Sequence, residues 1–145
     1  MVSFEECVKG EKLEIVQPSM EKALELIEKA ECFLNDSKKI LLNGMPNSAL
    51  INAYLSFLDA SRALMAADGW REKQNHACVV AFIRAKYGTV FGTNLIYSFD
   101  KLRETRNKTQ YSPSFYPTEQ EAKEAIRFAD EFVNKTWKIL EERKP

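Results

Sequence analysis

The chain has 145 residues, of which 45% are hydrophobic, and its 21 basic and 21 acidic side chains give a formal net charge of zero. This length is typical of one domain that can bury a core without a metal or a disulfide. We therefore interpret residues 1–145 as a single domain. The neutral balance excludes proteins that bind nucleic acid through bulk positive charge, but it allows a local basic site.

Cysteine and histidine usage predicts a cytoplasmic protein without a metal or cofactor. Cys7, Cys32 and Cys78 are far apart and odd in number, which predicts reduced thiols. The single histidine, His76, argues against a zinc site, and no glycine-rich phosphate loop, HExxH or G-x-S-x-G motif is present. No apolar run approaches the ~20 residues of a membrane span, and the N-terminus lacks the apolar core of a signal peptide.

The first predicted helix follows a lead segment at residues 1–17. Pro18 ends this segment, and Ser19 is suited to cap the helix. The helix is expected to end at Asn43-Gly44, because glycine readily adopts the left-handed conformation that follows a helix. Between these points, apolar residues recur three, four or seven apart along one stripe: Met20, Leu24, Ile27, Ala30, Leu34 and Leu41.

The second predicted helix begins at Asn47 or Ser48 and ends before Asp68-Gly69. Between residues 49 and 67 it is apolar on more than one face. A helix that is apolar nearly all round is usually buried, so we expect this one to be the central helix of a bundle.

Two shorter helices are expected next. Residues 70–74 form a charged connection to a third helix at residues 75–87, and residues 89–94 are expected to form a loop. The fourth helix covers residues 95–110 and stops at Ser112-Pro113, because a residue before proline disfavours helical geometry.

The last predicted helix has a clear start, because Thr118 and Glu121 have the spacing of a capping box after Pro117. No strand-like alternation is visible along the chain. Long helices joined by short turns predict an all-α fold, an antiparallel up-and-down helical bundle of about five helices.

The fourth predicted helix carries the candidate binding residues. Arg103 and Asn107 are four residues apart on one face, Arg106 lies beside them, and Lys108 adds charge. Arginine presents a planar fork of donors that suits phosphate. The alternative is that Arg103 and Arg106 pair with acids on adjacent helices.

The order of three segments resembles a known family. The second and third predicted helices contain SALINAYLSFLDASRALMAADGWREKQNHACVVAFI, with an A-R-A-L stretch, a glycine, and a charged turn that includes His76. The fourth contains LRETRNKTQY, and the last contains PTEQEAKEAIRFADEFVNKTWKIL. In this order and spacing they resemble the HEPN domains, a family of small all-α proteins.

The resemblance implies a site at the end of the fourth helix. Active HEPN members use an arginine, a polar residue and a later histidine as a metal-independent ribonuclease site where two copies meet. Carried over to this chain, the implied catalytic residues are Arg106, Asn107 and, at the histidine position five residues after the arginine, Tyr111. An ordinary tyrosine hydroxyl has a pKa near ~10, which suits general-base work at neutral pH poorly.

Three functions stay open at this point. The first is a homodimeric, toxin-type or accessory subunit that works with a minimal nucleotidyltransferase, as the resemblance implies, and binds RNA or a nucleotide through Arg103, Arg106 and Lys108. The second is a metal-independent ribonuclease, acting as an RNA toxin at a dimer interface. The third is a non-catalytic protein-interaction module. His76 is interpreted as structural, with a catalytic role as the alternative.

Overall fold

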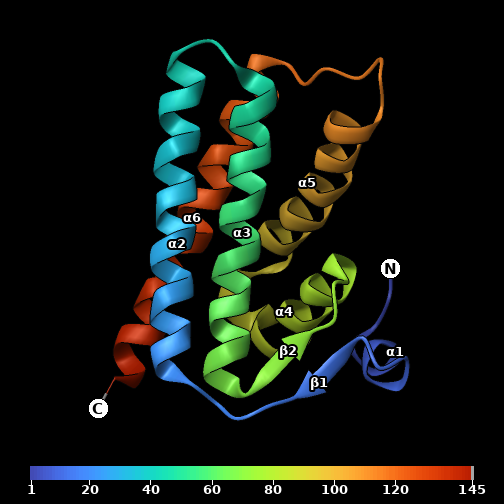
Figure 1. The fold of residues 1–145 in the computed structure, drawn as a ribbon, viewed down its shortest axis with the longest axis vertical. Helices are drawn as coiled ribbons and strands as arrows, with labels where there is room; N and C mark the ends of the chain where they lie inside the picture. Colours follow the sequence, from blue (N-terminus) through green and yellow to red (C-terminus); the bar gives the residue numbers. More distant parts are fainter. Residues whose placement is uncertain (145) are drawn as a thin grey trace.

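Three long helices form the frame of the fold (Figure 1). The computed structural model describes residues 1–144. In it, α2 (Met20–Leu42), α3 (Pro46–Asp68) and α6 (Glu119–Arg143) pack against one another. Consecutive helices α2 and α3 run in opposite directions, as the short turn between them requires (Figure 1).

The remaining helices lie on another side of α3. They are α4 (His76–Phe91) and α5 (Thr93–Tyr111), both in contact with α3, and the short α1 (Phe4–Lys9), which packs on α4. In Figure 1, α5 diverges from α3 toward its C-terminal end, where the chain crosses back to α6. The predicted all-α bundle is confirmed, with α1 as a short sixth helix among the described residues.

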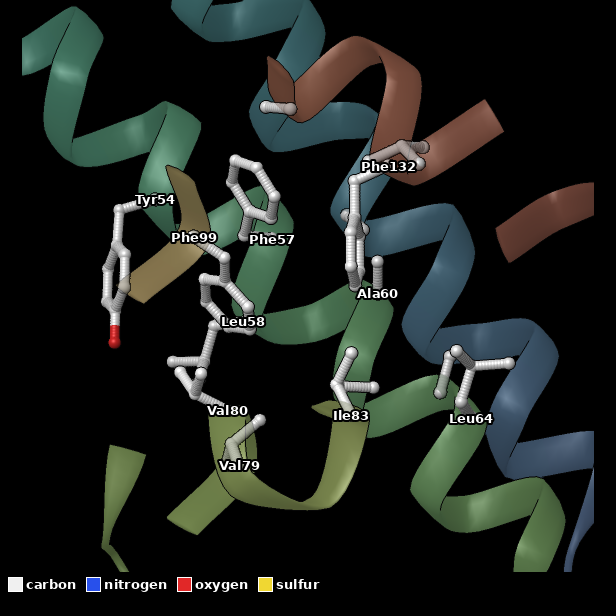
Figure 2. Close-up of a cluster of buried hydrophobic side chains, with 14 of the residues drawn as sticks. Tyr54, Phe57, Leu58, Ala60, Leu64, Val79, Val80, Ile83, Phe99 and Phe132 are labelled. Carbon is white, nitrogen blue, oxygen red and sulfur yellow. The ribbon is translucent and has the colours of Figure 1, made fainter. Parts of the chain in front are cut away.

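The central position predicted for the second helix is confirmed. α3 has the largest number of buried residues of any helix in the described chain, and Tyr54 and Phe57 are fully buried on it. The ring of Phe57 stacks on Phe99 of α5 and contacts Phe132 of α6, each at a centroid distance of 4.9 Å. Figure 2 shows these rings meeting between the three helices, so the core lies where α3, α5 and α6 converge.

Side chains cap the two helices for which the sequence predicts caps. Ser19 accepts a hydrogen bond from the backbone N–H of Lys22 at the start of α2. At the start of α6, Thr118 and Glu121 form both hydrogen bonds of the capping box. α3 differs from the prediction, because it begins at Pro46, whose missing N–H and fixed φ suit the first helical position without a side-chain cap.

The predicted loop at residues 89–94 is wrong, because α4 continues as a helix to Phe91. The backbone deviates from helical geometry only locally at Tyr87, and Gly92, with φ of +85°, then separates α4 from α5. Phe91 is buried and stacks on Phe132 at a centroid distance of 4.2 Å. This aromatic packing stabilises the last turn of α4, so the helix continues past Gly88, where a glycine would otherwise favour a helix end.

A short antiparallel sheet is present although no strand-like alternation is visible in the sequence. β1 (Leu13–Ile15) in the lead segment pairs with β2 (Trp70–Glu72), a segment expected to be a charged connection. Strands of three residues are too short to show an alternating pattern, which is why the sequence does not reveal them. The pairing fixes the chain just before α4.

The prediction that the cysteines are reduced is wrong for two of them. Cys7 of α1 and Cys78 of α4 form a disulfide, while Cys32 is free and exposed. The two bonded residues are 71 positions apart, so their spacing in the sequence gives no sign of the bond. They meet because β1 pairs with β2 and places α1 against the beginning of α4.

Within the described residues, no helix is both long and apolar enough to cross a membrane.

Candidate functional site

Arg106 continues the buried face of α5. Leu95, Phe99 and Leu102 lie on this face, and each is at most 6% exposed. Arg106 follows Leu102 by four residues, a spacing that keeps it on the same face. Arg106 is accordingly only 9% exposed, so a charged side chain occupies a position that the helical pattern assigns to the core.

Neutral groups surround the guanidinium of Arg106. Its Nη1 donates to Oε1 of Gln110 at 2.9 Å, and its Nη2 lies 3.0 Å from Nδ1 of His76. The central guanidinium carbon is 4.7 Å from the centroid of the Tyr54 ring, which is cation–π distance. The Nε atom is buried and has no hydrogen-bond partner among residues 1–144. The site therefore joins α3, α4 and α5 around one cation.

The charge of Arg106 has no carboxylate partner within the described part of the chain. The alternative that Arg103 and Arg106 pair with acids on adjacent helices is thus not observed. Instead, Arg103 pairs with Asp100 of α5 itself, with 3.1 Å between Nε and Oδ1. Taking a cation out of water costs on the order of several kcal/mol when no ion pair compensates it. Such a group is unusual in a scaffold.

Two donors meet at one nitrogen of His76. The Tyr54 hydroxyl oxygen lies 3.0 Å from Nδ1, as does Nη2 of Arg106. A guanidinium nitrogen can only donate, so Nδ1 must be the unprotonated nitrogen that accepts. His76 is therefore neutral in this arrangement, with its proton on Nε2. In Figure 2 the Tyr54 hydroxyl points away from the rings of Phe57 and Phe132, as its bond to His76 requires.

The electrostatic surroundings favour these protonation states. Burial lowers the pKa of His76, and the nearby positive charges of Arg62 and Arg106 lower it further, while Glu72 opposes them. Burial also raises the pKa of Tyr54 to about 12. His76 is thus held as a neutral acceptor, and Tyr54 as a protonated donor.

The turn between β2 and α4 positions His76. Asn75 caps α4 by accepting from the backbone N–H of Cys78 at 3.0 Å, and its own N–H donates to Glu72 at 3.1 Å. Glu72 also accepts from Nε of Arg62 on α3 at 2.7 Å. The first residue of α4 is therefore fixed by the strand before it and by α3 beside it.

Arg62 and Arg103 differ from Arg106 because both have acidic partners. Arg62 pairs with Glu72 and, at 3.4 Å, with Asp59. Arg103 pairs with Asp100, as described above, so its charge is compensated within its own helix. Of the three arginines around His76, Arg106 alone lacks a carboxylate within residues 1–144, and we infer that it is the one available to an anion.

The other predicted site residues lie on the outer face of α5. Asn107 and Lys108 are exposed, and Tyr111 is 70% exposed. These three residues, with Ser112, line a shallow open hollow at the C-terminal end of the helix. Among the described residues, Arg106 forms its side-chain hydrogen bonds with Gln110 and His76 and none with Tyr111, so the structure brings the motif arginine to His76.

Two of the residues at the site were not identified from the sequence. Gln110 lies four residues after Arg106, and that helical spacing is a usable signal for contact. Tyr54 comes from a different helix, and only its general tendency to bond its hydroxyl to a partner is predictable. The sequence predicts a structural role for His76, and the residue does bond neighbouring groups, which are the side chains of Tyr54 and Arg106 at the candidate site.

No group of three or more histidine, cysteine or acidic side chains within residues 1–144 has an arrangement that could hold a metal ion. The groups that meet at the site are a buried guanidinium, a neutral imidazole and a tyrosine hydroxyl. The guanidinium can bind an anion, and its contacts with the imidazole of His76 and the ring of Tyr54 hold it in position.

Comparison with known proteins gives one match, to a protein family. No curated protein matches the chain. The family model of the HEPN domain matches residues 23–140, a span that runs from the first turn of α2 into the last turn of α6 and includes every residue of the Arg106 site. The match covers most of the chain, and the fold agrees with it. The protein therefore belongs to the HEPN domain family, a nucleotide- and RNA-related family of helical domains.

Proposed function

We propose that the protein binds a phosphate group of RNA or of a nucleotide at Arg106. The observation that carries this proposal is the buried guanidinium without a carboxylate partner in the described chain. A phosphate oxygen supplies the missing negative charge, and the planar fork of arginine donors matches phosphate geometry. Binding an anion would thus recover the free energy that burial of the uncompensated cation costs.

The contact with Gln110 provides a route for the ligand. Gln110 is exposed and is held to Arg106 through one hydrogen bond, from Nη1. Its side chain can therefore turn into solvent without disturbing the core. A phosphate that replaces it on Nη1 gains a charge-assisted hydrogen bond, which is about twice as strong as a neutral one.

The neighbouring basic residues extend the binding surface. Lys108 is exposed near the C-terminal end of α5, where it is available to an adjacent phosphate. Arg103 lies one turn before Arg106 and is partly exposed. We propose that Arg106 provides the main contact and that these two residues follow the backbone of a longer ligand.

The proposed assembly is a homodimer that works as a toxin-type or accessory subunit with a minimal nucleotidyltransferase. Membership of the HEPN family supports this proposal, and the position of Arg106 near the end of α5 is compatible with a second copy beside it. Light scattering on the purified protein tests the dimer. A monomer at micromolar concentrations would contradict it.

A metal-independent ribonuclease at a dimer interface is the second candidate, and one contact favours it. His76 places an imidazole beside Arg106 although Tyr111 occupies the motif position. RNA cleavage needs a group that takes a proton from the 2′-hydroxyl and a group that returns one to the leaving oxygen. Because Nδ1 of His76 already accepts from Arg106 and Tyr54, it is not free to take that proton, so we place binding before cleavage.

The cytoplasmic location predicted from the sequence stays a prediction. Disulfides persist mainly in oxidising compartments, so the bond between Cys7 and Cys78 weighs against a reducing environment.

Fluorescence anisotropy with a labelled single-stranded RNA tests the proposed function. Arg106→Ala should lower the affinity about tenfold or more, because hydrogen bonds to charged groups contribute about 1.5–3 kcal/mol. The matched control is Arg127→Ala on α6, where an exposed arginine pairs with Glu124. Equal affinities of the two variants would contradict the proposal.

The same samples separate the remaining alternatives. Absence of RNA and nucleotide binding by the wild-type protein would favour the interaction module. Robust RNA cleavage in the presence of a chelator, abolished by Arg106→Ala, would favour the ribonuclease. Thermal melting of each variant shows whether a loss of binding reflects unfolding.

A further inference from the structure

We propose that His76 is a positioning residue for Arg106, whose neutral ring holds the guanidinium for phosphate, and that protonation of His76 switches this site off. The inference rests on the proposed function and adds its regulation by pH. Nη2 of Arg106 and the Tyr54 hydroxyl oxygen both lie 3.0 Å from Nδ1 of His76.

Protonation would place a third donor at this point. An imidazolium carries protons on both ring nitrogens and accepts from neither. The N–H at Nδ1 would then face a guanidinium N–H across a hydrogen-bonding distance, and two positive charges would be adjacent. His76 and Arg106 cannot keep this contact, so Arg106 would lose one of its two hydrogen-bonded partners and its position over the Tyr54 ring.

The protonation state of His76 depends on the charged and titratable groups of every element that packs against it. α3 contributes Tyr54 and Arg62, β2 contributes Glu72, and α5 contributes Arg103 and Arg106. Three of the four charged groups are therefore positive. Burial and these cations lower the pKa of His76, and Glu72 only partly offsets them. The neutral ring is the stable form at neutral pH, and the switch operates on acidification.

The sign of the pH dependence separates positioning from direct binding. If His76 positions Arg106, RNA affinity falls as the pH is lowered and the ring becomes charged. If His76 instead contacted phosphate itself, the new positive charge would raise the affinity on acidification. The phosphodiester groups of RNA do not titrate between about pH 5 and 8, the range in which histidine does.

The test measures the affinity for oligouridylate across this range for the wild type, His76→Asn and His76→Ala. The amide oxygen of asparagine can accept from Arg106 and does not titrate. We expect His76→Asn to bind within about threefold of the wild type and to lose the pH dependence, whereas His76→Ala should lose about tenfold. Thermal melting checks that each variant is folded.

Nitrogen NMR of the ring provides a readout that needs no ligand. The chain has one histidine, so its ring signals are assigned without further variants. We expect a protonated Nε2 and an unprotonated Nδ1 at neutral pH, with Arg106→Ala changing the titration of the ring. The opposite tautomer, or an affinity that rises on acidification, would overturn the inference.

The outcomes also distinguish this inference from the proposed function. Binding by the wild type that is unaffected by His76→Ala overturns the positioning role and leaves the function intact. Absence of RNA binding by the wild type overturns both.

Discussion

The two halves of the buried face of α5 follow the same helical spacing but contain different chemistry. In the first half, Phe99 lies against Phe57 and Phe132 within an aromatic cluster (Figure 2). One turn beyond Leu102, the same face presents Arg106 to a histidine, a glutamine and the ring of Tyr54. The first half is built for packing, and the second half holds a cation.

Residues in the first half stabilise the fold, whereas Arg106 in the second half is available for a function. Aromatic burial at Phe99 contributes directly to the free energy of folding. A buried guanidinium without a carboxylate does not, because its desolvation offsets what the neutral contacts supply. Proteins tolerate such costs mainly where a ligand uses the group.

Truncation of Phe57 of α3, which packs on the aromatic half of α5, should have the largest effect. Phe57→Ala should lower the free energy of unfolding by about 3–5 kcal/mol, because it leaves a cavity between α3, α5 and α6. Urea denaturation followed by circular dichroism measures this change. Tyr97→Ala is the control, because Tyr97 is 60% exposed, and it should change stability by less than about 0.5 kcal/mol. Similar changes in the free energy of unfolding for the two variants would contradict the central position of Phe57 in the core.

Loss of the disulfide should have the next largest effect. Cys7→Ser should lower the free energy of unfolding by about 2–4 kcal/mol, because the bond closes a long loop in the unfolded chain. A thiol reductant should produce the same shift in the wild type. Cys32→Ser, at the free and exposed cysteine, should show no shift. A melting temperature that is insensitive to reductant would indicate that the bond does not form in solution.

The difference between the two halves also explains what the sequence could and could not reveal. Helical spacing is sufficient to predict α2, α3 and α6, and capping residues also locate the starts of α2 and α6, because those signals are local. Arg106 was identified through a family motif within α5. Its contacts with His76 and Tyr54 could not be predicted, since they come from α4 and α3 and depend on how the helices pack.

The same limit applies to the lead segment. β1 and β2 are too short to give a pattern, and Cys7 is 71 residues from Cys78. These features appear only when distant segments meet. The extension of α4 to Phe91 is similar, because packing on Phe132 outweighs the local signal of a glycine.

Acidification should have a smaller effect, confined to the polar half. The pKa of His76 is lowered in the folded protein, so the unfolded chain binds more protons as the pH falls below about 6.5. Stability should therefore decrease with falling pH in this window, by at most about 1.4 kcal/mol per pH unit from this one group. His76→Asn should remove that component of the pH dependence. A pH profile of stability that is the same in this variant as in the wild type would contradict the neutral, half-buried state of His76.

The smallest expected change in stability is at Arg106. This prediction tests the difference between the two halves of the buried face of α5 most directly. Arg106→Met keeps an unbranched apolar side chain at this position but removes the charged guanidinium. We expect the free energy of unfolding to change by less than about 1 kcal/mol or to increase, because no ion pair is lost within the described chain. The same variant should lose RNA affinity by about tenfold or more.

The decisive measurement is therefore RNA affinity and unfolding free energy together on Arg106→Met. Our account predicts a protein that is as stable as the wild type, or more stable, and that binds RNA poorly. A variant that binds RNA as the wild type does, or one destabilised as strongly as Phe57→Ala, would show that Arg106 belongs to the scaffold.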